Sequence, residues 1–161
     1  MIKKKSNLNV LEIQSNQKAY FNFFIEKKIE AGLILKGWEV KSLRLGIVNI
    51  NTAYITIKNS EVFLCGSYFE RLSTISKNIL KKKNDRQCKL LLNKYEINFL
   101  KSKIYQKGYT IIPLSIFLKK SWFKLKIGLA IGKKNQDKRM DDKKKQWIRD
   151  KNRLIKNKNL N

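Results

Sequence analysis

Apolar and polar residues alternate most regularly near the end of the chain, in the segment WFKLKIGLAIG. Every second residue from Phe123 to Ile131 is apolar, and Lys124 and Lys126 lie between them. A period of two places the two sets on opposite faces of a β-strand. Together with the preceding YTIIPLSIFL and a turn near KKSW, this segment predicts a β-hairpin.

Two further segments have the composition of strands. AYITIKNSEVFLCG alternates in the same way on both sides of Asn59-Ser60, which predicts a second hairpin with its turn at that pair. KAYFNFFIEKKIEAGLIL is rich in aromatic and β-branched residues, and it predicts a strand from about Phe23 to Leu35.

Two short helices are predicted between these strands. In KGWEVKSLRLG the residues Trp38, Ser42 and Leu45 recur at helical spacing, and Gly46 follows as a stop signal. The second helix begins after Asn93, which is followed three residues later by Glu96 as in a capping box, and it runs toward Gly108. Residues 73–88 between the two helices are predicted to form a basic loop.

These elements predict a mainly β fold with short helices. Five or six short strands, two hairpins and two inserted helices favour a small closed or partly open antiparallel barrel, with the OB-fold as the usual nucleic-acid-binding example. A small α+β sandwich fits the same pattern. The expected organisation is a flexible basic arm over residues 1–16, an OB-like barrel over 17–131 and a basic tail over 132–161.

The tail has its own periodicity. On a helix over residues 140–155, Met140, Trp147, Ile148 and Ile155 gather on one side, and most lysines and arginines lie outside it. A single basic helix of this length is marginal in water, so the tail is expected to be disordered when free and helical when bound. A merely solubilising tail would explain the lysines but not the phased apolar residues.

Charge points to an anionic partner. Lys and Arg total 37 against 12 acids, which gives a net charge of +25. Nucleic acid is the first expected partner, and an anionic membrane surface is the second. The lysine bias is also what an AT-rich genome would produce, so the six arginines are the more informative bases.

The sequence offers little for catalysis. His is absent, Cys65 and Cys88 are far apart with no CxxC, and the adjacent Asp141 and Asp142 lie beside lysines. No phosphate-binding glycine motif is present, so we expect no enzyme, no cofactor and no metal site. Without an apolar run of the length a signal peptide or membrane span needs, we expect a cytoplasmic protein with reduced cysteines in its core.

Four segments together resemble the SmpB family, whose members bind transfer-messenger RNA (tmRNA). They are EAGLILKGWEVKSLRLG (Glu30 to Gly46), KLLLN (Lys89 to Asn93), KIGLAIGKKNQDKR (Lys126 to Arg139) and a downstream Trp147. The resemblance implies an OB-type barrel that holds the tRNA-like domain of tmRNA and a tail that lies in the empty mRNA path of a stalled ribosome. It also implies indirect partnership, through the RNA, with elongation factor Tu and alanyl-tRNA synthetase, and a monomer without chemistry of its own.

The resemblance also implies site residues. Glu30, Leu91 and Asn93 correspond to an RNA-contacting surface of the family; Leu91 could also be packed, and Asn93 could also cap a helix. The full expected RNA-binding set is Phe21, Glu30, Lys41, Arg44, Lys89, Leu91, Asn93, Lys124 and Lys126. The expected ribosome-contacting set in the tail, reaching the small-subunit decoding centre and mRNA channel, is Lys133, Lys134, Gln136, Asp137, Lys138, Arg139, Trp147 and Ile155.

The chain departs from the family pattern at two positions where members usually carry a histidine. Phe21 still offers a ring that could stack on a base, because stacking needs only a π-face. Gln136 has no ring, so a decoding-centre contact there would have to be a hydrogen bond. The alternatives left open are a structural ribosomal or general RNA-binding protein, and a metal-dependent nuclease, which would need clustered carboxylates.

Overall fold

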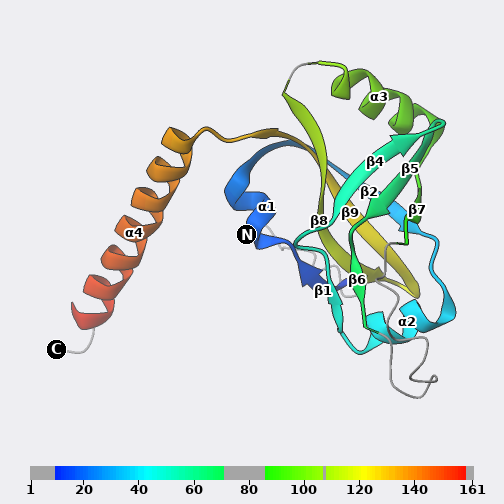
Figure 1. The fold of residues 1–161 in the computed structure, drawn as a ribbon. Coiled ribbons are helices and arrows are strands. Elements are labelled where there is room, and N and C mark those ends of the chain that lie inside the picture. Colours follow the sequence, from blue (N-terminus) through cyan, green and yellow to red (C-terminus); the bar gives the residue numbers. More distant parts are fainter. Residues whose placement is uncertain (1–9, 71–85, 107, 159–161) are drawn as a thin grey trace, which may run out of the picture.

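The predicted hairpins lie in one antiparallel sheet (Figure 1). In this computed structural model, residues 10–70, 86–106 and 108–158 are described. The sheet has the strand order β1-β8-β9-β2-β7-β5-β4. Its strands are β1 (Val10–Ser15), β2 (Phe23–Leu33), β4 (Tyr54–Lys58), β5 (Glu61–Cys65), β7 (Cys88–Leu91), β8 (Tyr109–Lys119) and β9 (Trp122–Gly132), and β3 (Val48–Asn49) pairs separately with β6 (Tyr68–Phe69).

Both predicted hairpins are confirmed. Asn59 and Ser60 join β4 to β5 with φ angles of 49° and 60°, the left-handed pair that a tight two-residue turn needs. Lys120 turns β8 into β9 with a φ of 58°. The alternating pattern therefore gave these pairings correctly, because each hairpin is built from neighbouring sequence.

Both predicted short helices are also confirmed. Helix α2 (Gly37–Arg44) ends just before Gly46, whose φ of 73° is the left-handed conformation that terminates many helices. Helix α3 (Lys94–Ile104) begins after Asn93, and the Asn93 N–H donates to Glu96 Oε2 at 2.9 Å. These two helices lie toward opposite ends of the sheet (Figure 1).

The N-terminal arm was predicted incorrectly in part. Val10–Ser15 forms β1 and pairs with β8, so at least these residues are not a flexible arm; residues 1–9 lie outside the described residues. Helix α1 (Gln17–Asn22) follows directly and was not predicted. The predicted basic loop over residues 73–88 lies mostly outside the described residues, and its end belongs to β7.

Two apolar clusters hold the sheet together. The larger cluster lies on the inner side of the curled sheet and includes Ala31, Leu125 and Ile127, all without exposed surface. The smaller one lies between α1 and the outer side, where Ala19 packs near Leu114. Cys65 and Cys88 are buried and free, as predicted.

The expected barrel is not closed. Strands β1 and β4 are the two ends of the sheet, and no ladder joins them in the described part of the chain. The sheet nevertheless curls enough for β4 to lie against β8. Of the closed and partly open forms that the sequence pattern favoured, the described residues therefore exclude the closed one, because the sheet is open although strongly curled.

The tail forms one helix, α4 (Asn135–Lys158), which extends away from the sheet on the side of α1 (Figure 1). It includes the predicted helical residues 140–155 and begins earlier. Since the helix is present in the chain alone, the expected disorder of the free tail is not confirmed. No helix among the described residues is long and apolar enough to cross a membrane.

Candidate nucleic-acid interface

The sheet brings five predicted RNA-binding residues onto one face. Glu30 on β2 lies directly opposite Lys126 on β9, and the neighbouring position Gly32 lies opposite Lys124. Directly opposed residues point to the same side of an antiparallel sheet. Gly32 also pairs with Leu91 on β7, which places Leu91 on this side as well. We call this surface the lysine face and define it by Glu30, Lys89, Leu91, Lys119, Lys124 and Lys126.

Glu30 is the acidic centre of the lysine face. Lys119 Nζ donates to Glu30 Oε2 at 2.9 Å, and this hydrogen bond lowers the pKa of the Glu30 carboxyl below its ordinary value of 4.5. The nearby charges of Lys119, Lys124 and Lys126 lower the pKa further, while partial burial opposes them. The carboxylate is therefore ionised at neutral pH and already has a partner in the free protein.

Lys126 has an aromatic support. Its Nζ lies over the ring of Phe117 on β8, at 5.2 Å from the ring centroid. A cation held over a ring keeps its charge at the surface while its methylene stem covers apolar area. Phe117, although only 2% exposed, thus orients a lysine on the outer side of the sheet.

The β7 edge of the face supplies an apolar residue and a paired lysine. Leu91 is 53% exposed, yet a Cβ added at Gly32 would lie 3.2 Å from Leu91 Cβ. Leu91 therefore packs over Gly32 and remains available at the surface, so the packed and RNA-contacting roles are compatible. Lys89 forms an ion pair with Glu61. Asn93 follows at the N-cap of α3, where its side chain is exposed.

Lys41 and Arg44 lie elsewhere. Both are exposed on α2, which belongs to the end of the sheet and not to the lysine face. Arg44 lines a hollow of about 320 Å³ together with Leu11 of β1 and Phe123 of β9. The structure thus separates these two predicted RNA-binding residues from the other strand positions.

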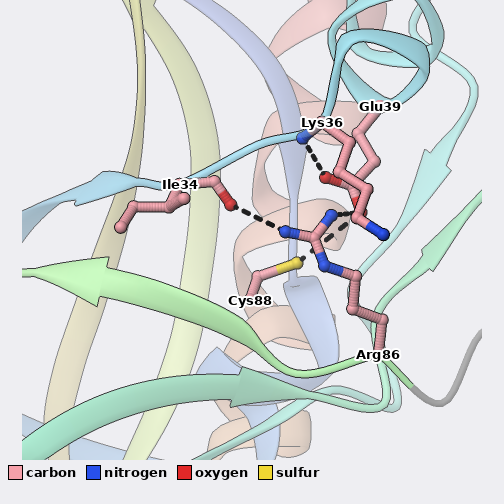
Figure 2. A network of polar contacts seen from close by, with 5 residues as sticks. All are labelled: Ile34, Lys36, Glu39, Arg86 and Cys88. Carbon is pink, nitrogen blue, oxygen red and sulfur yellow. Dashed lines mark hydrogen bonds and ion pairs between the residues drawn. The ribbon is translucent and has the colours of Figure 1, made fainter.

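A buried network fixes α2 against the strands that carry the lysine face (Figure 2). Glu39 on α2 is only 1% exposed; its Oε1 lies 2.5 Å from Arg86 Nη1, and its Oε2 accepts the Lys36 N–H at 2.6 Å. Arg86 also donates to the carbonyl of Ile34, just after β2, at 3.4 Å. Burial, followed by the charge of Glu39, raises the pKa of the neighbouring Cys88 thiol to about 11, so this thiol stays protonated.

The first predicted tail residue is part of the junction with α1. The Lys133 N–H donates to the Asn22 carbonyl at 2.9 Å, and Lys133 Nζ donates to the Tyr20 carbonyl at 3.2 Å and to Asp141 Oδ2 at 2.6 Å. Phe21 lines the adjoining hollow of about 460 Å³, beside Lys133. These contacts connect the start of α4 to the body and place Phe21 next to the tail.

The remaining tail residues lie along α4. Asp137 Oδ2 accepts the Lys134 N–H at 3.0 Å, which satisfies a free backbone donor at the start of the helix. Trp147 is 64% exposed, and Lys151 Nζ lies 5.3 Å from its ring centroid. Gln136, Arg139 and Ile155 are exposed, and Lys138 is half-buried. The helix therefore presents an aromatic residue and several bases to any partner.

Sequence reasoning missed three residues. Lys119 could have been assigned to the lysine face, because in the predicted β8–β9 hairpin it lies opposite Trp122, two residues before Lys124. Glu39 and Arg86 had no such signal, because their contact joins segments 47 positions apart (86 − 39). Among the described residues, no group of three or more His, Cys, Asp or Glu side chains could hold a metal ion.

The fold and the lysine face together define a small, basic, mainly β protein with lysines on an open sheet and a projecting basic helix. The family model described as SmpB protein matches residues 13–157. The SsrA-binding protein of Ruthia magnifica subsp. Calyptogena magnifica is 47% identical over 157 residues, covering 98% of this chain and 93% of that protein. The SsrA-binding protein of Buchnera aphidicola subsp. Acyrthosiphon pisum is 47% identical over 154 residues, covering 96% and 94%.

Solved structures include a similar chain. A structure described as "tmRNA-SmpB: a journey to the center of the bacterial ribosome" contains a chain that is 36% identical, with a TM-score of 0.61. The match covers 76% of this chain and 85% of that one. The chain belongs to the SmpB family.

Proposed function

We propose that this protein binds tmRNA and delivers it to stalled ribosomes for trans-translation. The observation that carries the proposal is the lysine face, found in a chain that matches SsrA-binding proteins over nearly its full length. The class of activity is RNA binding and delivery, without a chemical step of its own.

Within this proposal, the lysine face meets the tRNA-like domain. Lys89, Lys119, Lys124 and Lys126 would neutralise phosphates, and Leu91 would supply apolar contact. Glu30 cannot attract phosphate, but its carboxylate can accept hydrogen bonds from ribose hydroxyls or base amino groups. The exposed amide of Asn93 lies at the β7 edge of the same surface and would add a neutral polar contact.

The tail would then enter the ribosome. Lys134 lies just before α4, the residues Gln136, Asp137, Lys138 and Arg139 lie in its first turns, and Trp147 and Ile155 lie further along it. In the decoding centre and the empty mRNA channel, ribosomal RNA would neutralise the bases of this helix. Elongation factor Tu and alanyl-tRNA synthetase would be partners only through the RNA, and the protein would act as a cytoplasmic monomer.

The first test identifies the RNA that copurifies with the tagged protein and measures affinity for the isolated tRNA-like domain. Glu30→Ala together with Asn93→Ala should weaken binding, by about 1 to 3 kcal/mol for each buried hydrogen bond lost. Glu70→Ala with Asn98→Ala, at two exposed residues outside the lysine face, is the charge-matched control. An affinity of the test variant within threefold of wild type would contradict the assigned site.

Salt dependence provides the second test. The logarithm of the association constant should fall linearly with the logarithm of salt concentration, because lysines displace counterions from phosphate. Lys124→Glu or Lys126→Glu should reduce this slope, and Lys101→Glu should not. If the protein were instead a structural ribosomal protein, it would be present stoichiometrically in every ribosome rather than only in stalled ones.

A further inference from the structure

The open side of the sheet contains a pocket that lies apart from the lysine face. Where β4 approaches β8 without a ladder, a pocket of about 280 Å³ lies between α1, β4 and the first half of β8. Its β8 wall is formed by residues 110–112, whereas Lys119 of the lysine face lies at the other end of that strand. The pocket therefore lies on the side where the curled sheet does not close.

One buried amide fixes the walls of this pocket. Asn16 is 4% exposed, and its Nδ2 donates to the carbonyl of Pro113 at 3.1 Å and to that of Ile50 at 3.4 Å. Its Oδ1 accepts the Ala19 N–H at 3.1 Å, which caps α1. Asn16 therefore links α1, β8 and the loop before β4, so a ligand would enter a preformed site with a small ordering cost.

The lining combines neutral polar groups with an apolar floor. Of the lining residues, Ala19 and Ile112 are buried, while Asn22, Asn51 and Thr110 are half-buried. In the part of the chain that the structure describes, the side chains of these three polar residues make no hydrogen bond. Two amides and a hydroxyl offer both donors and acceptors, as the edge of a nucleobase requires.

The rim adds a ring and a charge. Tyr54 at the start of β4 is 55% exposed, so its ring is accessible for stacking. Lys18 on α1 is exposed at the same pocket and could contact one phosphate. A single charge beside neutral amides and an aromatic ring does not suit a highly charged small ligand, but it does suit one unstacked nucleotide.

We infer that this pocket binds an unpaired nucleobase of single-stranded RNA, with Tyr54 stacking on the base and Asn22 and Asn51 hydrogen-bonding its edge. Unstacked bases are recognised by aromatic rings and by polar groups on their edges. The volume lies just below the usual range of about 300–1,000 Å³ for small-molecule sites, which fits one base. The inference relies on the proposed RNA-binding function for its ligand class, and it adds a second RNA contact beyond the lysine face.

The test uses the full chain carrying Lys124→Ala and Lys126→Ala, so that the lysine face contributes less. Fluorescently labelled octamers of uridylate or adenylate serve as probes, and anisotropy gives their affinity. Adding Tyr54→Ala should weaken octamer binding by about 5-fold or more, and Asn51→Ala should weaken it several-fold. Tyr95→Ala and Asn98→Ala on α3 are matched controls, since both residues are exposed.

Salt dependence separates the pocket from the lysine face. Because Tyr54 and Asn51 are neutral, their loss should lower the affinity without changing the slope against salt, whereas lysine variants change the slope. The side-chain amide signals of Asn22 and Asn51 should also shift in NMR spectra when octamer is added. This readout needs no substitution, so it tests the pocket even if a variant folds poorly.

Three results would overturn the inference. The first is that both pocket variants bind the octamer within twofold of the affinity of the chain carrying only Lys124→Ala and Lys126→Ala. The second is that the α3 controls lose as much octamer affinity as the pocket variants do. The third is a free mononucleotide binding as tightly as the octamer, which would assign the pocket to a metabolite. All three could occur while the tRNA-like domain still binds through the lysine face, so failure here is distinct from failure of the proposed function.

Discussion

Glu30 is the acid in a face otherwise made of lysines and Leu91. Lysines attract any phosphate backbone, because each is a point charge with freely rotating donors. A carboxylate repels phosphate but can accept specific hydrogen bonds. In the proposed interface the lysines would therefore supply most of the affinity, and Glu30 would supply discrimination, with Lys119 holding it in place beforehand.

The titration of Glu30 tests that arrangement. Lys119 stabilises the charged carboxylate, so the pair contributes stability above the ordinary pKa of 4.5 and loses it as pH falls through the lowered pKa. Lys119→Met should raise the pKa of Glu30 toward 4.5, as measured by NMR of its carboxyl carbon over the acidic range. Lys101→Met should leave it unchanged. An identical titration in both variants would show that Lys119 does not hold Glu30.

At the scale of elements, local pairing was predictable and distant pairing was not. The β8–β9 hairpin and α3 follow from alternation and a capping signature within single segments. Strand β1 pairs with β8 about a hundred residues away, and its apolar and polar residues alternate only from Leu11 to Gln14. This run is short and follows a polar, basic start, so the sequence resembles an arm. Helix α1 has only six residues, too few for a reliable period.

In the candidate site, too, the local features could be predicted from the sequence and the distant contacts could not. Lys124, Lys126 and Glu30 each lie on a recognisable strand, so their shared side could be anticipated once β2 and β9 were paired. Sequence could not show that Lys119 would reach Glu30, since 89 positions separate them. Closure of the barrel depends on whether β1 meets β4, which is a property of curvature and register that no local pattern records.

Gly128 tests the packing of the smaller apolar cluster, to which Leu114 of β8 and Ile25 of β2 belong. A Cβ there would lie 3.0 Å from Leu114 Cδ1 and 3.2 Å from Ile25 Cγ2. Gly128→Ala should therefore lower the free energy of unfolding by about 1 to 3 kcal/mol, through overpacking. Gly132→Ala on the same strand, where nothing lies within 4 Å, is the matched control and should be nearly neutral in urea unfolding. Equal effects of the two changes would contradict this packing.

Arg86 tests how α2 is joined to β2 and β7. Arg86→Ala would leave the buried carboxylate of Glu39 without its ion-pair partner, and the loss should be about 2 to 4 kcal/mol in urea unfolding. Because 29% of the Arg86 side chain is exposed, we expect a smaller loss of stability than for a fully buried ion pair. Arg44→Ala, an exposed arginine on α2, should change stability by less than about 0.5 kcal/mol. If Arg86→Ala lowered the free energy of unfolding no more than Arg44→Ala does, the network would contribute little to stability.

The whole molecule divides into a sheet body and a projecting helix with few contacts between them. Lys133 makes the described hydrogen bonds across the junction, to Asn22 and Tyr20. Further along α4, Met140, Trp147 and Ile155 remain exposed instead of covering the sheet. Because so little apolar surface is buried between the two parts, the body should fold without the helix, and the helix is free to meet another partner.

Deleting every residue after Gly132 separates the two proposed roles. The thermal midpoint should hardly change, because the removed part buries little and its charges mostly repel one another. Binding to tmRNA should survive, somewhat weakened by the loss of non-specific attraction. Tagging of stalled nascent chains should be abolished, because the complex could arrive at the ribosome but could not occupy the empty mRNA channel.

Substitutions within the full-length chain locate that defect along the tail. Replacing Asp137, Lys138 and Arg139 by Ala should reproduce much of the loss of tagging, through lost charge-assisted contacts with ribosomal RNA. Trp147→Ala should reproduce part of it through lost stacking. Replacing Lys143 and Lys144 by Ala removes two positive charges from the same helix and should have a smaller effect if position matters more than charge. Normal tagging by the truncated protein would reduce the tail to a solubilising extension, whereas failure to bind tmRNA would mean that part of the RNA-binding surface lies beyond Gly132.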